Sequence, residues 1–219
     1  MTPDFQTAAT RATETLIKYN ICAAPVDPLP ILKSIPDVLV VSYETMSTEM
    51  GMDRSCVIDM FGDRNHDAFT SVNIIDGKPH YLVTFNQQLP AFLSQRSLAR
   101  ELGHIILGHD GSRPEEVRLE EARCFARHLL CPRALIHTLQ ATGMRLTTDV
   151  FNNITSCNDY CLFCIRRQPG VHVPPELNRQ VRDQFMPYIK NFFEYQRHAS
   201  VKDGSALVDL GTYMDGYEE

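Results

Sequence analysis

The sequence predicts an α+β fold, in which a small antiparallel or mixed sheet is followed by two central helices. Two observations lead to this class. Residues 71–75 and 80–85 are strand-like runs on either side of Asp76 and Gly77, a dipeptide that favours the positive φ angles of a tight hairpin. From residue 93 onward, the apolar residues recur instead with a helical period.

The chain before the hairpin contains few long segments with a regular hydrophobic period. Four prolines between residues 25 and 36 leave room for only a short helix there. In chain order, we expect an opening helix at 4–19, a short helix at 31–34, a buried β-branched strand at 38–41, a loop at 44–54 and a second strand at 56–61.

The chain after the hairpin is predicted to be helical. Gly108 is a plausible stop for the first helix, and Pro114 suits the first turn of the second. We expect helices at 93–108 and 114–130, a helical region at 145–168, a linker at 169–175 and a helix at 176–196 with a kink or break at Pro187. These elements predict a main domain over 1–140, a helical extension over 141–197 and a mobile acidic tail over 198–219.

Charge and composition narrow the classes of function. The 219 residues carry 21 Lys and Arg against 27 Asp and Glu, a net charge of −6. The tail holds one lysine against five acidic residues, which leaves only −2 on the rest of the chain. We therefore expect no direct binding of nucleic acid. No apolar run approaches the roughly 20 residues of a membrane helix, and no signal peptide is recognisable. Together with seven cysteines, an odd number, this favours a cytoplasmic protein with reduced thiols.

The segment from Arg100 to His104 carries the clearest chemical signal. It reads Arg-Glu-Leu-Gly-His, which is close to the His-Glu-x-x-His pattern of zinc proteases. In that pattern two histidines on one helix face bind the metal, and the glutamate takes a proton from the metal-bound water. A single Glu-x-x-His is a weak signal alone, because it also arises by chance.

The following helix strengthens the interpretation. On a helical wheel, Glu121 shares a stripe with Val117, Cys124, Phe125 and His128. A lone carboxylate on a core-facing stripe needs a partner, because an unpaired buried charge is costly. The ordinary alternative is a solvated run of acidic residues from 115 to 121, and the wheel argues against it for Glu121.

Together these two helices resemble the ImmA/IrrE metallo-endopeptidases. That family typically combines a His-Glu-Leu-Gly-His helix with a Glu-Ala-x-x-Phe-Ala-x-x-Leu-Leu-x-Pro helix, and the second pattern matches residues 121–132. The resemblance covers about residues 15–140. It implies a zincin-like fold with a bound zinc ion and a protein partner, often a helix-turn-helix repressor that is cleaved or relieved. Carried over by position, His104 and Glu121 would be zinc ligands and Glu101 the general base.

Arg100 departs from the family, since it stands where the first zinc ligand belongs. A guanidinium stays protonated at physiological pH and has no lone pair to offer a metal. One hypothesis is that Arg100 pairs with Glu121 or Glu101 and replaces the zinc electrostatically.

A rival hypothesis is a rearranged zinc site completed by another histidine. His109 lies away from Arg100 on the wheel of the first helix, so that helix face does not favour it. His128 lies on the Glu121 stripe and is the better candidate, although a packed histidine is its more ordinary interpretation.

The cysteines offer two further interpretations. Cys157, Cys161 and Cys164 have the spacing of a radical-SAM cluster, but only 55 residues follow, too few for the barrel of those enzymes. A zinc site that also uses His172 is conceivable, whereas the helical spacing favours core packing. Nucleophilic catalysis by Cys124 or Cys131 with His128 is the other interpretation, but the sequence nearby shows no sign of an oxyanion hole.

The sequence thus supports two functions. The first is a zinc-dependent endopeptidase that acts on a cytoplasmic repressor or regulator. The alternative is a pseudopeptidase that binds its regulator without cutting it, with Arg100 in the place of the metal.

Overall fold

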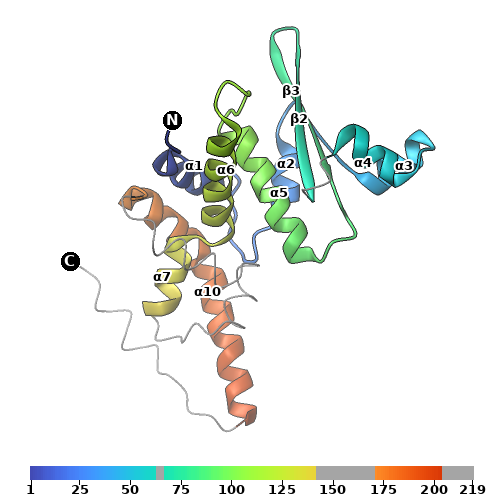
Figure 1. Cartoon of the computed structure of the whole chain (residues 1–219). Coiled ribbons are helices and arrows are strands. Elements are labelled where there is room, and N and C mark those ends of the chain that lie inside the picture. Colours follow the sequence, from blue (N-terminus) through green and yellow to red (C-terminus); the bar gives the residue numbers. More distant parts are fainter. Residues whose placement is uncertain (63–66, 142–170, 204–219) are drawn as a thin grey trace.

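The computed structural model describes residues 1–62, 67–141 and 171–203, and side chains up to residue 194. Its elements are α1 (Phe5–Lys18), α2 (Pro28–Ser34), β1 (Val38–Ser42), α3 (Tyr43–Met50), α4 (Arg54–Phe61), β2 (Ala68–Ile75), β3 (Lys78–Phe85), α5 (Ala91–Ile106), α6 (Glu115–Leu130), α7 (Arg133–Ala141) and α10 (Pro175–Asp203). This is the predicted α+β class, with a small sheet and two central helices (Figure 1).

The sheet has three strands in the order β1-β3-β2. β2 and β3 form the predicted hairpin, in which Ile75 pairs with Lys78 across Asp76 and Gly77. Both turn residues have positive φ, at 51° and 75°, as a tight hairpin turn requires. β1 pairs with β3 in parallel, so the sheet is mixed, which is one of the two predicted arrangements. Leu39 of β1 is 61% exposed and only Ser42 of this strand is buried, so the expectation of a buried strand is wrong.

Two short helices replace a loop and a strand that the sequence predicted. The expected loop at 44–54 contains α3, whose N-cap Ser42 accepts a hydrogen bond from the Thr45 amide and whose end at Gly51 adopts a left-handed φ. The expected strand at 56–61 is α4. A short, mostly apolar run does not distinguish a strand from a helix, and Val57 is the buried residue of this helix.

The core is built mainly from helices. α1 packs on α6, and α6 packs on α5. Gly103 in α5 is needed for the last contact, since a Cβ there would lie 3.2 Å from the Ala122 backbone and 3.1 Å from Phe125. β2 and β3 lie against α5, so the hairpin forms one side of the region where the motif residues lie. Figure 1 shows the hairpin reaching well beyond the helices.

The C-terminal helix joins this core. α10 contacts α1 and α7, and its Val181, Phe185 and Ile189 belong to the same buried cluster as Leu16. Pro187 lies inside α10, so the predicted break is absent and the helix extends past the expected end at residue 196. The predicted helical region at 145–168, with its cysteine stripe, and most of the acidic tail lie outside the described residues.

None of the described helices is both long enough and apolar enough to cross a bilayer.

Candidate functional site

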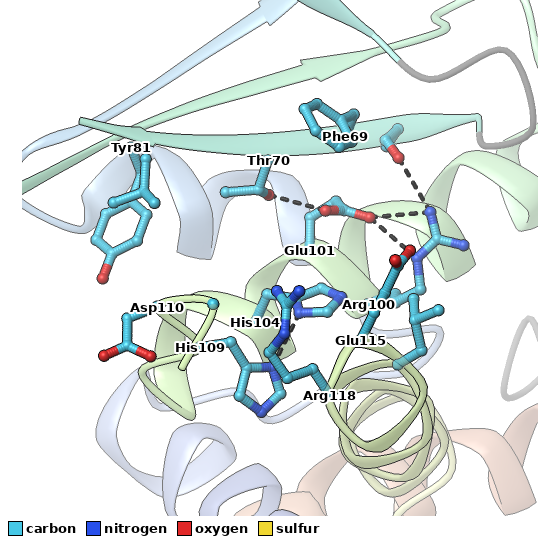
Figure 2. A pocket seen from close by; sticks show the side chains of 14 residues that line it. Phe69, Thr70, Tyr81, Arg100, Glu101, His104, His109, Asp110, Glu115 and Arg118 are labelled. Carbon is cyan, nitrogen blue, oxygen red and sulfur yellow. Dashed lines mark hydrogen bonds and ion pairs between the residues drawn. The ribbon is translucent and has the colours of Figure 1, made fainter. Parts of the chain in front are cut away.

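Arg100 and Glu101 form an ion pair beneath strand β2. The Arg100 Nη2 and the Glu101 Oε1 are 2.9 Å apart, and Arg100 Nε donates to the same oxygen at 3.0 Å. Arg100 Nη2 also donates to the Ala68 carbonyl at 3.0 Å, and the Thr70 hydroxyl donates to Glu101 Oε2 at 2.8 Å (Figure 2). Glu101 is 4% exposed. Both of its oxygens are therefore engaged in a buried cluster, and of the two hypothesised partners of Arg100 the structure selects Glu101.

His104 contacts His109, which the sequence analysis had disfavoured. Their Nδ1 atoms lie 2.9 Å apart, and the rings meet edge to face. The wheel argument failed because it assumed that the helix continued to residue 109. α5 ends at Ile106, and Gly108 then turns the chain with a φ of 66°, so that the His109 amide donates to the His104 carbonyl. His109 thus folds back onto the helix end.

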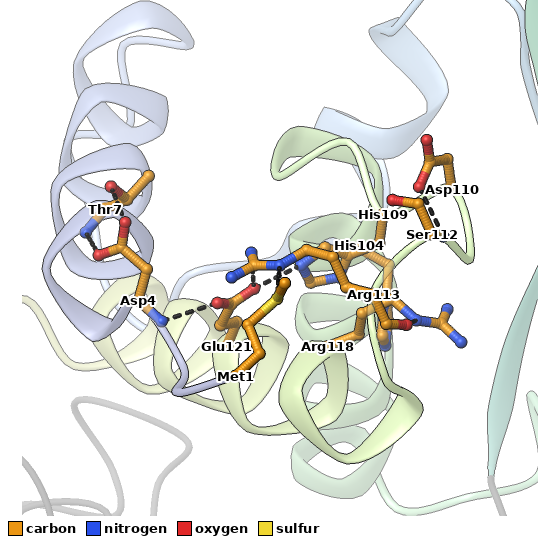
Figure 3. A network of polar contacts seen from close by, with 10 residues as sticks. All are labelled: Met1, Asp4, Thr7, His104, His109, Asp110, Ser112, Arg113, Arg118 and Glu121. Carbon is orange, nitrogen blue, oxygen red and sulfur yellow. Dashed lines mark hydrogen bonds and ion pairs between the residues drawn. The ribbon is translucent and has the colours of Figure 1, made fainter.

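Glu121 lies at the far side of His109 and is 2% exposed, in agreement with its place on the apolar stripe. Its Oε1 accepts a 2.7 Å hydrogen bond from the Asp4 amide. Its Oε2 lies 3.0 Å from His109 Nε2 and accepts from Arg113 Nη1 at 2.8 Å. Figure 3 shows Glu121 between the start of α1 and Arg113, which also contacts Met1. Arg113, not Arg100, is therefore the guanidinium that neutralises Glu121.

The two histidines and Glu121 form one hydrogen-bonded chain. Burial lowers the pKa of His109 below its usual value, against the opposing effect of Glu121, and Arg118 and Arg113 lower this pKa further. A neutral His109 donates from Nε2 to the carboxylate and accepts at Nδ1, so His104 carries its proton on Nδ1.

A cavity of about 360 Å³ opens beside these groups. Its wall combines β2, the end of α5, the following loop and the start of α6. The polar lining residues are Thr70, Tyr81, Arg100, Glu101, His104, His109, Asp110, Glu115 and Arg118. Glu121 lies behind His109 rather than on the wall. His128, the favoured substitute ligand from the sequence, is buried in α6 and does not line this cavity.

Comparison with known families identifies this region. Residues 60–156 match the family model of the IrrE N-terminal-like domain, a peptidase family, which spans the β2–β3 hairpin, α5 and α6. This region is therefore similar to the ImmA/IrrE family. Searches of curated proteins and of solved structures found no match to the chain. The match indicates a metallopeptidase-like domain in this region, from a family whose typical metal is zinc.

The donor set of this IrrE-like domain does not fit a zinc ion. Zinc requires lone pairs from at least three side chains, arranged around one point. Arg100 offers none, and Glu121 is held by three donors, of which Arg113 is a cation. Across the described residues, no three His, Cys, Asp or Glu side chains are grouped so that they could hold a metal.

Three residues of this site escaped the sequence analysis, namely Asp4, Thr70 and Arg113. Asp4 acts through its backbone amide, which any residue provides. Thr70 is a single polar residue in a strand with no distinguishing pattern. Arg113 lies in a loop, where no periodicity predicts direction, although its place just before the Glu121 helix was a usable signal.

Proposed function

We propose that this protein is a cytoplasmic pseudopeptidase, a domain that keeps the cleft of a metallopeptidase and binds a segment of a regulatory protein there without cutting it. The observation that carries the proposal is the buried ion pair of Arg100 and Glu101. In this pair the Arg100 guanidinium is a fixed cation at the first ligand position. Glu101, which would act as the general base, is bound to that cation.

The ion pair opposes catalysis in two ways. A second cation beside the Arg100 guanidinium would be repelled in a partly buried site, where charges are poorly screened. In addition, Glu101 could accept a proton only by giving up its charge-assisted bonds to Arg100. The Ala68 carbonyl fixes the guanidinium from a third direction, so rotation of Arg100 alone would break three hydrogen bonds.

The cleft remains suited to an extended chain. β2 is an edge strand of the described sheet, and its Ala68, Phe69, Thr70 and Val72 line the cavity. An extended segment can add to such an edge through backbone hydrogen bonds, while the cavity receives its side chains. The resemblance to repressor-directed peptidases makes a helix-turn-helix regulator the proposed source of that segment.

A second candidate function is an active peptidase with a shifted zinc site. The contacts of His104 with His109, and of His109 with Glu121, favour it, because they link three potential ligands in one chain of contacts, although their donor atoms do not surround a common point. Zinc binding there would require Arg113 to leave Glu121 and the two histidines to exchange their mutual hydrogen bond for metal bonds. The lining of the cavity by Arg100 stands against it.

A peptide assay separates the two functions. A library of extended peptides, including segments of helix-turn-helix regulators, is incubated with the zinc-supplemented protein and with its Arg100→His variant, and products are identified by mass spectrometry. The proposal expects binding by the unaltered protein, unchanged by a chelator, and no cut products. Chelator-sensitive cleavage by the unaltered protein would establish the shifted site instead, and an absence of binding would reject the pseudopeptidase.

A further inference from the structure

A second group of cationic side chains lies between α5 and α6. Arg96 and Arg100 are four residues apart on α5, and Arg123 and Arg127 are four residues apart on α6. Residues with this spacing share one face of a helix. All four arginines line a second cavity of about 390 Å³, and Arg100 lines both this cavity and the peptidase-like cleft. We call these four residues the arginine groove.

The groove has more positive charge than its own residues neutralise. The lining residues include two carboxylates, Asp67 and Glu120. Glu120 pairs with Arg123 at 2.7 Å in an exposed ion pair, and Arg100 is bound to Glu101. In the described part of the chain, no ion pair is formed by either Arg96 or Arg127.

Arg127 carries the sharpest sign of a missing partner. Its Nε atom is buried and has no hydrogen-bond acceptor within the described structure. A buried charged donor without an acceptor costs more free energy than a neutral one, so such groups normally have a ligand, ion or water as partner. The like charges on α5 and α6 add to this cost, because four guanidinium groups around one cavity repel each other.

The lining defines the chemistry of the missing partner. Guanidinium groups bind phosphate through paired N–H donors, and a phosphate dianion has enough acceptor oxygens for several of them. Leu93, Ala126 and Leu130 provide an apolar surface in the same cavity, and Ser97 adds a hydroxyl. The volume is that of a small-molecule site, and two carboxylates in the wall disfavour a polyanion such as nucleic acid.

We propose that the arginine groove is an anion site that binds a phosphate dianion, carried by a small organic molecule whose apolar part lies on Leu93 and Leu130. This site is separate from peptide binding in the cleft, and Arg100 forms the wall between them. It does not depend on whether the peptidase-like cleft is active.

Isothermal titration calorimetry on the full chain tests the proposal, with inorganic phosphate and phenyl phosphate as probes at constant ionic strength. We expect saturable binding of both, with phenyl phosphate the tighter of the two. Arg96→Gln and Arg127→Gln should each weaken the affinity about tenfold or more, since each removes charge-assisted hydrogen bonds. Equal affinity for the two probes would identify free phosphate as the ligand and overturn the organic part of the proposal.

Control variants keep the test decisive. Arg182→Gln alters an exposed arginine on α10 that pairs with Asp183, and it should leave the affinity unchanged. Arg127→Lys guards against a folding defect, because it keeps the charge while losing the paired donors, and it should give an intermediate affinity. The proposal fails if no saturable binding occurs up to about 10 mM phenyl phosphate, or if both glutamine variants, folded by circular dichroism, bind as tightly as the unaltered protein.

Discussion

Two buried glutamates, Glu101 on α5 and Glu121 on α6, are neutralised by arginines in different ways. At one end of the site, Arg100 is adjacent in sequence to Glu101 and its side chain is 16% exposed. At the other, Glu121 is met by Arg113, whose side chain comes from a loop and is 34% exposed. The first pair lies on helix α5 and is held by groups of strand β2, whereas the second depends on a loop and the N-terminus. The comparison indicates that Arg100 is held firmly in a position that excludes a metal. Arg113 can leave Glu121 more easily, so the Arg113 end of the site is the adjustable end.

The largest effect is expected from neutralising the two glutamates. Glu101→Gln leaves Arg100 buried without its counter-charge, which should cost about 3 kcal/mol of unfolding free energy. Glu121→Gln should cost less, about 2 kcal/mol, because Arg113 can turn to water. Urea unfolding of both variants measures the difference. An unfolding free energy for Glu101→Gln equal to or above that of the unaltered protein would indicate a strained catalytic carboxylate rather than a structural pair.

A smaller effect is expected from the arginine at the adjustable end. Arg113→Gln removes a partly exposed ion pair and keeps the Asp4 and His109 bonds to Glu121, so the loss should be about 1 kcal/mol. Thermal unfolding measures it, with Arg123→Gln, an exposed ion-pair variant, as the matched control. A loss as large as that of Glu101→Gln would remove the distinction between the two ends.

The last effect is a pH dependence at the His109 end, which is measured as a slope rather than as a single loss. Burial lowers the folded-state pKa of His109 below 6.5, so the folded protein releases this proton more readily than the unfolded chain does. Below pH 6.5 the unfolded chain therefore binds more protons, and stability falls as the pH falls, by at most about 1.4 kcal/mol per pH unit. His109→Gln should flatten this slope between pH about 7 and about 5. A slope unchanged in that variant would assign the dependence to another group.

The sequence predicted the parts of the site that lie on regular elements. The helical wheel placed Glu121 among buried residues, and Asp76 with Gly77 located the hairpin, because both inferences use a fixed period or a fixed turn geometry. The same reasoning misplaced His109, since a wheel has no meaning past the end of a helix. Arg113 and the Asp4 amide come from a loop and a helix start, where direction depends on tertiary packing.

The zinc content of the purified protein tests the central claim most directly, namely that Arg100 excludes the metal. The unaltered protein, refolded or dialysed with zinc, should retain less than about 0.1 equivalent by mass spectrometry of the metal. Arg100→His should retain more, and Arg100→His with Arg113→Gln should approach one equivalent, because that pair of changes supplies a ligand and frees Glu121. Stoichiometric zinc in the unaltered protein that is lost on Glu121→Ala would contradict the account.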